Sequence, residues 1–195
     1  KKIERLNLAE NNLIGTIPPE LGDMTSLKVL NLAGNSLKGS IPSRLADVFR
    51  LQRLNLAENR LTGRLPSALA DLGKLRSLIL ADNRLNGSLP AEYGKLTNLR
   101  VFDVKGNKLS GNIPEDLCQL ERLQRLNLSD NNFKGDLPAE LRNLKWLNER
   151  LPQEKTDAAF EVLDQLFQVT HNHHLVAYYE EKGQELEKVL NIFIP

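Results

Sequence analysis

The sequence predicts an α/β solenoid with a parallel sheet on its concave side, short helices or 3₁₀ turns on its convex side, and a helical C-terminal cap. Three observations predict this fold. A pattern of leucines returns every 24 residues, part of each copy alternates between apolar and polar residues, and an Asn, a Gly and a Pro stand at fixed places in every copy. Self-similarity at such a period is typical of one supersecondary unit stacked many times.

The first copy has the form I-x-x-L-x-L-x-x-N-x-L-x-G-x-I-P and runs from Ile3 to Pro18. The same frame returns without an insertion at Leu27, Leu51, Leu75, Leu99 and Leu123. Each copy holds its Asn, at positions 11, 35, 59, 83, 107 and 131. Six copies therefore fill residues 1–147, which we expect to form the solenoid.

Each position of the copy has a physical reason. Apolar residues at alternate positions, as at Leu54 and Leu56, predict a short strand whose leucines face the interior. The amide of the Asn carries two donors and an acceptor, which can satisfy backbone groups that a bend leaves unpaired. Gly permits a positive φ, and Pro favours an extended chain. After Pro66, leucines at spacings of three predict a 3₁₀ or short α turn.

The Leu-x-Gly-x-Ile/Leu-Pro stretch, present in all six copies, resembles the plant-specific class of leucine-rich repeats. The resemblance covers about three quarters of the chain. It implies a second layer of short strands at the Gly-x-Ile-Pro stretch. Members of this class serve as receptor ectodomains, inhibitors of secreted enzymes, intracellular scaffolds and recognition domains of bacterial effectors. Receptor ectodomains usually carry paired cysteines in caps at both ends, and these pairs are absent here, because Cys118 is the sole cysteine.

The period ends after Leu147. A polar segment over 148–155 predicts a loop, and two amphipathic runs between Thr156 and Phe193 predict helices. Two interpretations stay open for 148–195. The helices form a cap over the exposed leucines of the sixth copy, which an open solenoid end needs for solubility, or they begin a further module that binds a partner.

The strand residues that face outward form columns, one residue per copy. The core does not require their identity, and arginines beside apolar side chains are common in binding hot spots. The alternative is a solvated surface of ordinary polar ladders. The predicted partner-binding residues lie in the third and fifth columns: Arg5, Asn7, Val29, Asn31, Arg53, Asn55, Ser77, Ile79, Val101, Asp103, Arg125 and Asn127.

We find no motif for catalysis and predict no enzyme, no cofactor and no metal site. The cluster His171, His173 and His174 has no cysteine or carboxylate at a typical ligand spacing. A net charge of +1 argues against a nucleic-acid binder. No apolar run is long enough to cross a bilayer, so no membrane partner is expected.

The predicted function is a protein–protein interaction module that recognises a protein or peptide through its concave face. Two alternatives stay open: the recognition domain of a larger effector or enzyme, such as a bacterial type III effector, and a fragment of a secreted receptor or inhibitor. The lone Cys118 favours a cytoplasmic location. The sequons at Asn86 and Asn127 favour the secreted alternative weakly. The oligomeric state is left open.

Overall fold

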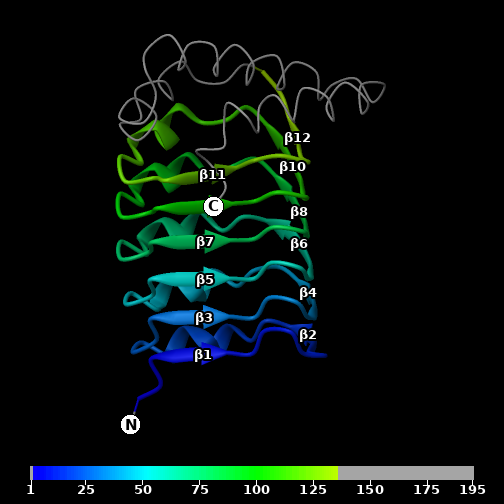
Figure 1. The fold of residues 1–195 in the computed structure, drawn as a ribbon, viewed down its shortest axis with the longest axis vertical. Coiled ribbons are helices and arrows are strands. Elements are labelled where there is room, and N and C mark those ends of the chain that lie inside the picture. The colour runs from blue at the N-terminus through cyan, green and yellow to red at the C-terminus, as the bar shows by residue number, and fades with distance from the viewer. Residues whose placement is uncertain (1, 136–195) are drawn as a thin grey trace.

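A computed structural model describes residues 2–135, and they form a solenoid of two parallel sheets joined by 3₁₀ helices (Figure 1). The concave sheet takes the first strand of each copy: β1 (Arg5–Asn7), β3 (Val29–Asn31), β5 (Arg53–Asn55), β7 (Ser77–Ile79), β9 (Val101–Asp103) and β11 (Arg125–Asn127). In Figure 1 these strands are stacked one above another, and each runs in the same direction as its neighbours.

The second sheet takes the second strand of each copy: β2 (Ile14–Thr16), β4 (Ser36–Gly39), β6 (Arg60–Arg64), β8 (Arg84–Gly87), β10 (Lys108–Gly111) and β12 (Asn132–Phe133). This layer is the one that the family resemblance implied. Most of its strands lie two or three residues earlier than the Gly-x-Ile-Pro stretch that the resemblance suggested: β8 is Arg84–Gly87, whereas that stretch is Gly87–Pro90. In β6 the strand covers the Leu-x-Gly part and ends before Leu65-Pro66, since proline donates no ladder hydrogen bond.

The convex side is formed by 3₁₀ helices, as the leucine spacing predicted: η1 (Pro19–Asp23), η2 (Ser43–Asp47), η3 (Ser67–Asp71), η4 (Ala91–Lys95) and η5 (Glu115–Gln119). Each begins directly after the copy's Pro, and in η1 the first residue of the helix, Pro19, is itself a proline. That Pro is extended, with φ of −65 to −68°, and sets the entry of the helix.

The two sheets differ in register. Concave strands pair residues 24 apart, such as Arg53 with Ser77, whereas second-sheet strands pair residues 22 apart, such as Arg64 with Asn86. The second sheet is therefore staggered by two residues per copy. Side chains that share a column of the sequence repeat do not lie side by side in that sheet.

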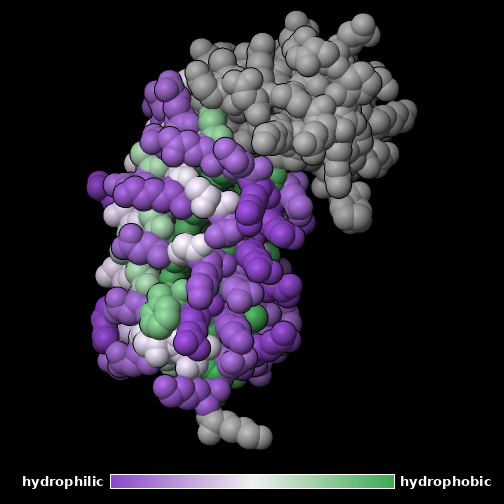
Figure 2. Space-filling view, turned by 90° about the vertical axis from the view of Figure 1, so that its left-hand side faces the viewer, coloured by the Kyte–Doolittle hydropathy of each residue, from purple (hydrophilic) through white to green (hydrophobic). Residues whose placement is uncertain are grey.

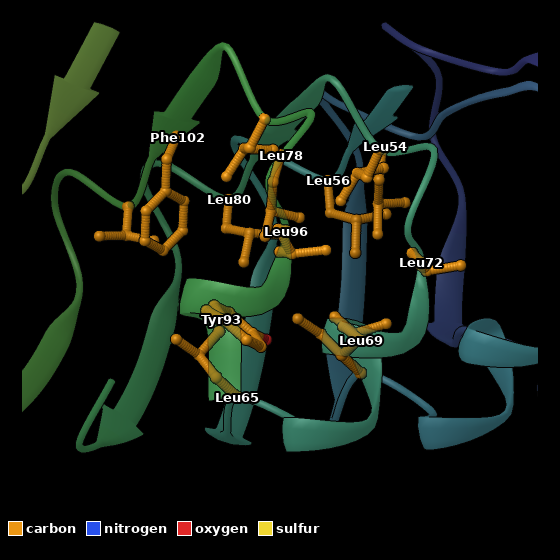
Figure 3. Close-up of a cluster of buried hydrophobic side chains, with 14 of the residues drawn as sticks. Leu54, Leu56, Leu65, Leu69, Leu72, Leu78, Leu80, Tyr93, Leu96 and Phe102 are labelled. Carbon is orange, nitrogen blue, oxygen red and sulfur yellow. The ribbon is translucent and has the colours of Figure 1, made fainter. Parts of the chain in front are cut away.

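The core lies between the concave strands and the 3₁₀ helices. Leucines of the concave strands, such as Leu54 and Leu78, point toward Leu69 and Tyr93 on the helical side (Figure 3). Tyr93 stands where the other copies have Leu. Its hydroxyl donates to the carbonyl of Pro66 at 3.1 Å, and its ring meets Phe102 edge to face at 6.0 Å. Burial raises the pKa of Tyr93 far above its ordinary value, which keeps the hydroxyl protonated as a donor.

The repeated asparagines form a ladder at the bend after each concave strand, which confirms their predicted role. The Asn59 Oδ1 accepts the N–H of Leu37 in the preceding copy at 3.0 Å. Its Nδ2 donates to the carbonyl of Leu32 in that copy at 3.0 Å. The same Nδ2 also reaches the carbonyls of Leu56 and Ala57 in its own copy, at 3.2 and 2.9 Å. One amide thus joins two copies.

The helical cap or module predicted over 148–195, and the boundary at 147, lie outside the described residues. Both stay predictions.

We expect Asn59→Ala to lower the free energy of unfolding by about 1–3 kcal/mol, because buried backbone groups of two copies lose their partners. Denaturant melts measure this. Asn11→Ala is the matched control: Asn11 is exposed and bonds only its own copy, at Leu8 and Ala9, so its loss should cost less. A loss below about 0.5 kcal/mol for Asn59→Ala would mean that water replaces the ladder.

Candidate partner-binding surface

The third column lies in one continuous row across the concave sheet. The backbone register places its members beside each other in the order Arg5, Val29, Arg53, Ser77, Val101, Arg125. The arginines are exposed and the others half-buried, since the alternation of the strands turns all six away from the leucine core. The row therefore places Val29 between two arginines and Val101 between Ser77 and Arg125.

The fifth column is less free than the sequence suggested. The side-chain oxygen of Asn55 accepts the backbone N–H of Ala57, two residues on, at 3.1 Å. The same bond, at 3.1–3.3 Å, recurs in four other copies, at Asn7, Asn31, Asp103 and Asn127. The expectation that the fold does not require these residue types is therefore wrong for five of the six copies. Ile79 is the exception, because it has no oxygen to accept the bond.

Two predicted site residues also bond each other. The Arg125 guanidinium lies 3.5 Å from the Asp103 carboxylate, whose side chain is only 10% exposed. Asp103 accepts the backbone N–H of Lys105 as well. Both side chains therefore have a structural partner, and a ligand would compete with that pairing for Arg125.

The seventh column was not predicted as part of the site: it holds alanine in the first four copies, and Lys105 and Ser129 in the last two. Ala33, Ala57 and Ala81 are each 8% exposed and form a small apolar cluster with Ala9 and Ile79, separate from the leucine core. The sequence contained a signal for this column. Outward residues alternate at the third and fifth positions, and the next position of that alternation is the seventh, where these alanines stand. They give the concave face a flat apolar floor beside Ile79.

The eighth column has a left-handed backbone in every copy. Gly34 and Gly106 occupy it with φ of 63 and 65°. The other four copies place acidic residues there with φ of 53–54°: Glu10, Glu58, Asp82 and Asp130. Such a conformation disfavours side chains other than Asn, Asp and Gly, so the two glutamates are strained. This conformation was not predicted from the sequence.

Charge is separated across the concave face. Arginines lie at the start of the strands, in the third column, and carboxylates lie at the end of the strands, in the eighth. At the rim, Lys28 donates to Glu4 at 2.8 Å, and this hydrogen bond, with the lysine charge, lowers the pKa of Glu4. An extended ligand lying along the solenoid would meet positive charge on one edge and negative charge on the other.

The side chains that remain after these structural roles form the central concave patch, defined as Arg53, Ser77, Ile79 and Val101. No hydrogen bond or ion pair between described residues engages their side chains. Ile79 and Val101 lie diagonally on neighbouring strands, with Arg53 and Ser77 in the same row as Val101. The patch offers one cation, one hydroxyl and two apolar side chains over an apolar floor.

One side of the solenoid next to the concave sheet is mostly hydrophilic (Figure 2). On the side where the chain enters the concave strands, hydrophilic residues predominate and hydrophobic ones show only in small patches (Figure 2). Within residues 2–135 no three His, Cys, Asp or Glu side chains gather as a metal set, and the His171–His174 cluster lies outside that range. None of the helices described is long and apolar enough to cross a membrane.

The two sequons differ in their surroundings. Asn86 is exposed on β8 of the second sheet. Asn127 accepts hydrogen bonds from both the N–H and the hydroxyl of Ser129, at 3.3 and 2.8 Å. The Asn127 side chain is therefore engaged within its own copy, whereas Asn86 faces outward between Arg64 and Lys108 of the neighbouring strands.

The fold is a repeat solenoid with rows of outward side chains on its concave sheet, and comparison with known proteins identifies its family. The family model for leucine-rich repeats in two copies matches residues 1–44. The model for a single leucine-rich repeat matches residues 50–72, 74–96, 98–120 and 122–144. The chain belongs to the leucine-rich-repeat family, and its repeats are of the plant type. The search of curated proteins finds no significant match.

Solved structures that resemble the chain are plant receptor ectodomains. One is the ectodomain of the plant membrane receptor kinase GASSHO1/SCHENGEN3 from Arabidopsis thaliana in complex with CASPARIAN STRIP INTEGRITY FACTOR 2: 38% identity, TM-score 0.73, covering 74% of this chain and 17% of that one. The ectodomain of the Arabidopsis receptor kinase HAESA, in complex with an N-terminally extended IDA peptide hormone ligand, has 38% identity and a TM-score of 0.71, covering 73% and 24%.

A shorter relative is a chain of the BIR3–SERK2 complex from Arabidopsis thaliana, with 38% identity and a TM-score of 0.61, covering 67% of this chain and 69% of that one. The chain thus spans between one sixth and one quarter of the large receptor ectodomains, and about two thirds of the short one.

We expect Glu58→Asn to raise the free energy of unfolding by about 0.5–1 kcal/mol, because Asn tolerates the left-handed backbone better than Glu. Glu58→Val should lower it by about 1 kcal/mol or more, since a β-branched residue is strained there. Denaturant melts compare the variants. Glu58→Gln removes the charge alone and should change stability by less than about 0.5 kcal/mol. Equal free energies of unfolding for Glu58→Asn and Glu58→Val would show that this backbone is not strained.

Proposed function

We propose that this chain is a recognition module that binds an extended peptide or the edge of a protein through its central concave patch. The observation that carries the proposal is the patch itself: Ile79 and Val101 are half-buried, Ile79 lies diagonally from Arg53 on the neighbouring strand, and Ser77 lies between Arg53 and Val101 in their row. The alanine floor extends the apolar area. Arginine next to desolvated apolar side chains is a composition found in binding hot spots. The six strands give a face about 25 Å long, enough for a peptide of several residues.

The charge separation supports a particular ligand chemistry. Side chains of an extended peptide alternate between its two edges. A peptide lying along the solenoid would therefore direct acidic side chains to the arginine column and basic ones to the carboxylate column. Apolar side chains at the centre would lie on Ile79 and Val101.

The comparisons support a protein or peptide as the partner. The matched ectodomain of HAESA was solved with a peptide hormone, and that of GASSHO1/SCHENGEN3 with an integrity factor. Because those matched chains are several times longer, their ligands and activities are not assigned to this chain.

We propose that the chain acts outside the cell, as part of a receptor or inhibitor. The similar structures are receptor ectodomains, and they favour this alternative over the cytoplasmic location and over the bacterial effector. The absence of cysteine pairs had favoured the cytoplasm, but a solenoid held by a leucine core and an asparagine ladder does not depend on disulfides. The proposed action is binding without catalysis.

The test begins with a displayed library of random peptides selected on the full chain. We expect enrichment of peptides that combine acidic, basic and apolar residues. The double variant Arg53→Glu with Val101→Asp should weaken binding of a selected peptide by at least about 30-fold, since a hot-spot residue contributes about 2 kcal/mol or more. Titration calorimetry measures the affinity.

The matched control is Lys74→Glu with Phe49→Asp, which makes the same two chemical changes on exposed side chains near the convex side. It should change affinity by less than about twofold, because surface charges contribute little at a distance. The free energy of unfolding of both double variants should lie within about 1 kcal/mol of that of the parent chain. Loss of binding in the control variant alone would contradict the concave assignment.

A further inference from the structure

The strands of the second sheet carry basic residues and no acidic ones. None of the six strands described, from β2 to β12, contains an Asp or a Glu. The cations are exposed and lie on these strands or directly after the last: Lys38, Arg60, Arg64, Arg84, Lys108 and Lys134. Strand alternation turns them outward, since the residue between Arg60 and Thr62 is the buried Leu61. The carboxylates of the eighth column precede these strands in the sequence.

These cations do not serve the fold. Lys38 lies directly opposite Arg60 in the register of neighbouring strands, an arrangement that destabilises a sheet through like-charge repulsion. None of the six forms an ion pair among residues 2–135. The concave sheet is different, because there Arg125 pairs with Asp103. A surface that collects unpaired charge at a cost to stability is expected to meet opposite charge in a ligand.

The stagger of the second sheet distributes the charge over the face. The register places Arg64, Asn86 and Lys108 in one row across three strands, and Thr62 beside Arg84 in the next row. Arg64 also lies flat. A side chain at Gly87, where φ is 80°, would lie 2.9 Å from the Arg64 Cγ and 3.4 Å from its Cδ. The glycine thus leaves room for the arginine stem to cross the neighbouring strand.

The other outward side chains of this sheet narrow the chemistry of the ligand. Between the cations lie hydroxyl and amide groups: Ser36, Thr62, Asn86, Ser110 and Asn132. The single large apolar side chain facing outward is Ile14 on β2, and the one aromatic, Phe133, is buried. Protein hot spots need apolar or aromatic anchors, and single-stranded nucleic acids need aromatic platforms for their bases. This sheet offers neither.

We propose that the second sheet binds an acidic polysaccharide, a linear chain of uronic-acid units. Such a chain carries regularly spaced carboxylates for the lysines and arginines, and hydroxyl groups for the Ser, Thr and Asn side chains between them. The surface is independent of the central concave patch, since it lies on the other sheet. A concave ligand and a polysaccharide can therefore bind at the same time.

The experiment uses the full chain produced in bacteria, so that the sequon at Asn86 carries no glycan. The probe is an oligouronate of about ten units, and titration calorimetry measures its affinity at low and at physiological salt. The triple variant Arg64→Gln, Arg84→Gln, Lys108→Gln should weaken binding at least about tenfold, because each charge contact on a surface contributes a fraction of a kcal/mol. Added salt should weaken binding to the parent chain.

The control variant changes the same residue types and the same net charge elsewhere. Lys74→Gln, Arg76→Gln and Arg100→Gln remove three exposed cations outside the second sheet. The affinity of this variant for the oligouronate should fall by less than about twofold, since the three cations that it lacks lie away from the ligand. A loss equal to that of the first variant would overturn the proposal, because binding would then follow total charge.

Three further probes separate the ligand classes. A neutral glucan should not bind, and polyglutamate and single-stranded DNA of the same charge should bind at least about tenfold more weakly than the oligouronate, because they lack the hydroxyl pattern that the sheet matches. Polyglutamate or DNA binding as tightly as the oligouronate would overturn the proposal in favour of an acidic protein or a nucleic acid. Retained oligouronate binding by the Arg53→Glu, Val101→Asp variant distinguishes this surface from the concave one.

Discussion

The structure depends on the amide of one asparagine per copy. At the bend after each concave strand the backbone leaves both N–H and C=O groups without a partner inside the copy, and burial makes such groups costly. The amide supplies an acceptor to the preceding copy and donors to both copies, as Asn59 does toward Leu37 and Leu32. Because the bond reaches backward by 22 and 27 residues, every copy needs its neighbour at a fixed offset. The period is therefore set by hydrogen bonding as much as by leucine packing.

The need to satisfy backbone groups at the bend also determines which outward side chains are left without a structural role and can contact a partner. The bend begins before the ladder asparagine, and the fifth column supplies a second acceptor there: Asn31 for Ala33, and Asn55 for Ala57. Outward direction is therefore not the same as freedom from the fold. Ile79 is informative for this reason, because the copy gives up the local acceptor and exposes an apolar side chain beside Val101 instead. A residue that forgoes a structural bond is a better candidate for contact with a partner than one that makes it.

The features of the fold that recur in every copy could be predicted from the sequence. Those that depend on how neighbouring copies are shifted against each other could not. Leucine alternation predicted the concave strands, spacing by three predicted η3, and the amide of Asn59 predicted the ladder. The left-handed backbone at Glu58 could not be inferred, because a glutamate is an unusual residue for it. The 22-residue register of the second sheet was also hidden, since the repeat has only one period. For the candidate site, the sequence predicted that the third column faces outward, while the pairing of Arg125 with Asp103 depends on how the two side chains meet in space.

The two registers arrange the outward side chains of the two sheets differently. In the concave sheet, residues of one column are side by side, so a single substitution per copy adjusts one continuous row, such as that from Arg5 to Arg125. A row of this kind suits a ligand that is extended along the solenoid and varies along its length. In the second sheet the stagger mixes columns, so that Arg64, Asn86 and Lys108 meet although they come from three positions of the repeat. Because such a row combines several positions of the repeat, a change at one position does not alter a whole row. We therefore expect this surface to suit a uniform ligand with a repeating charge.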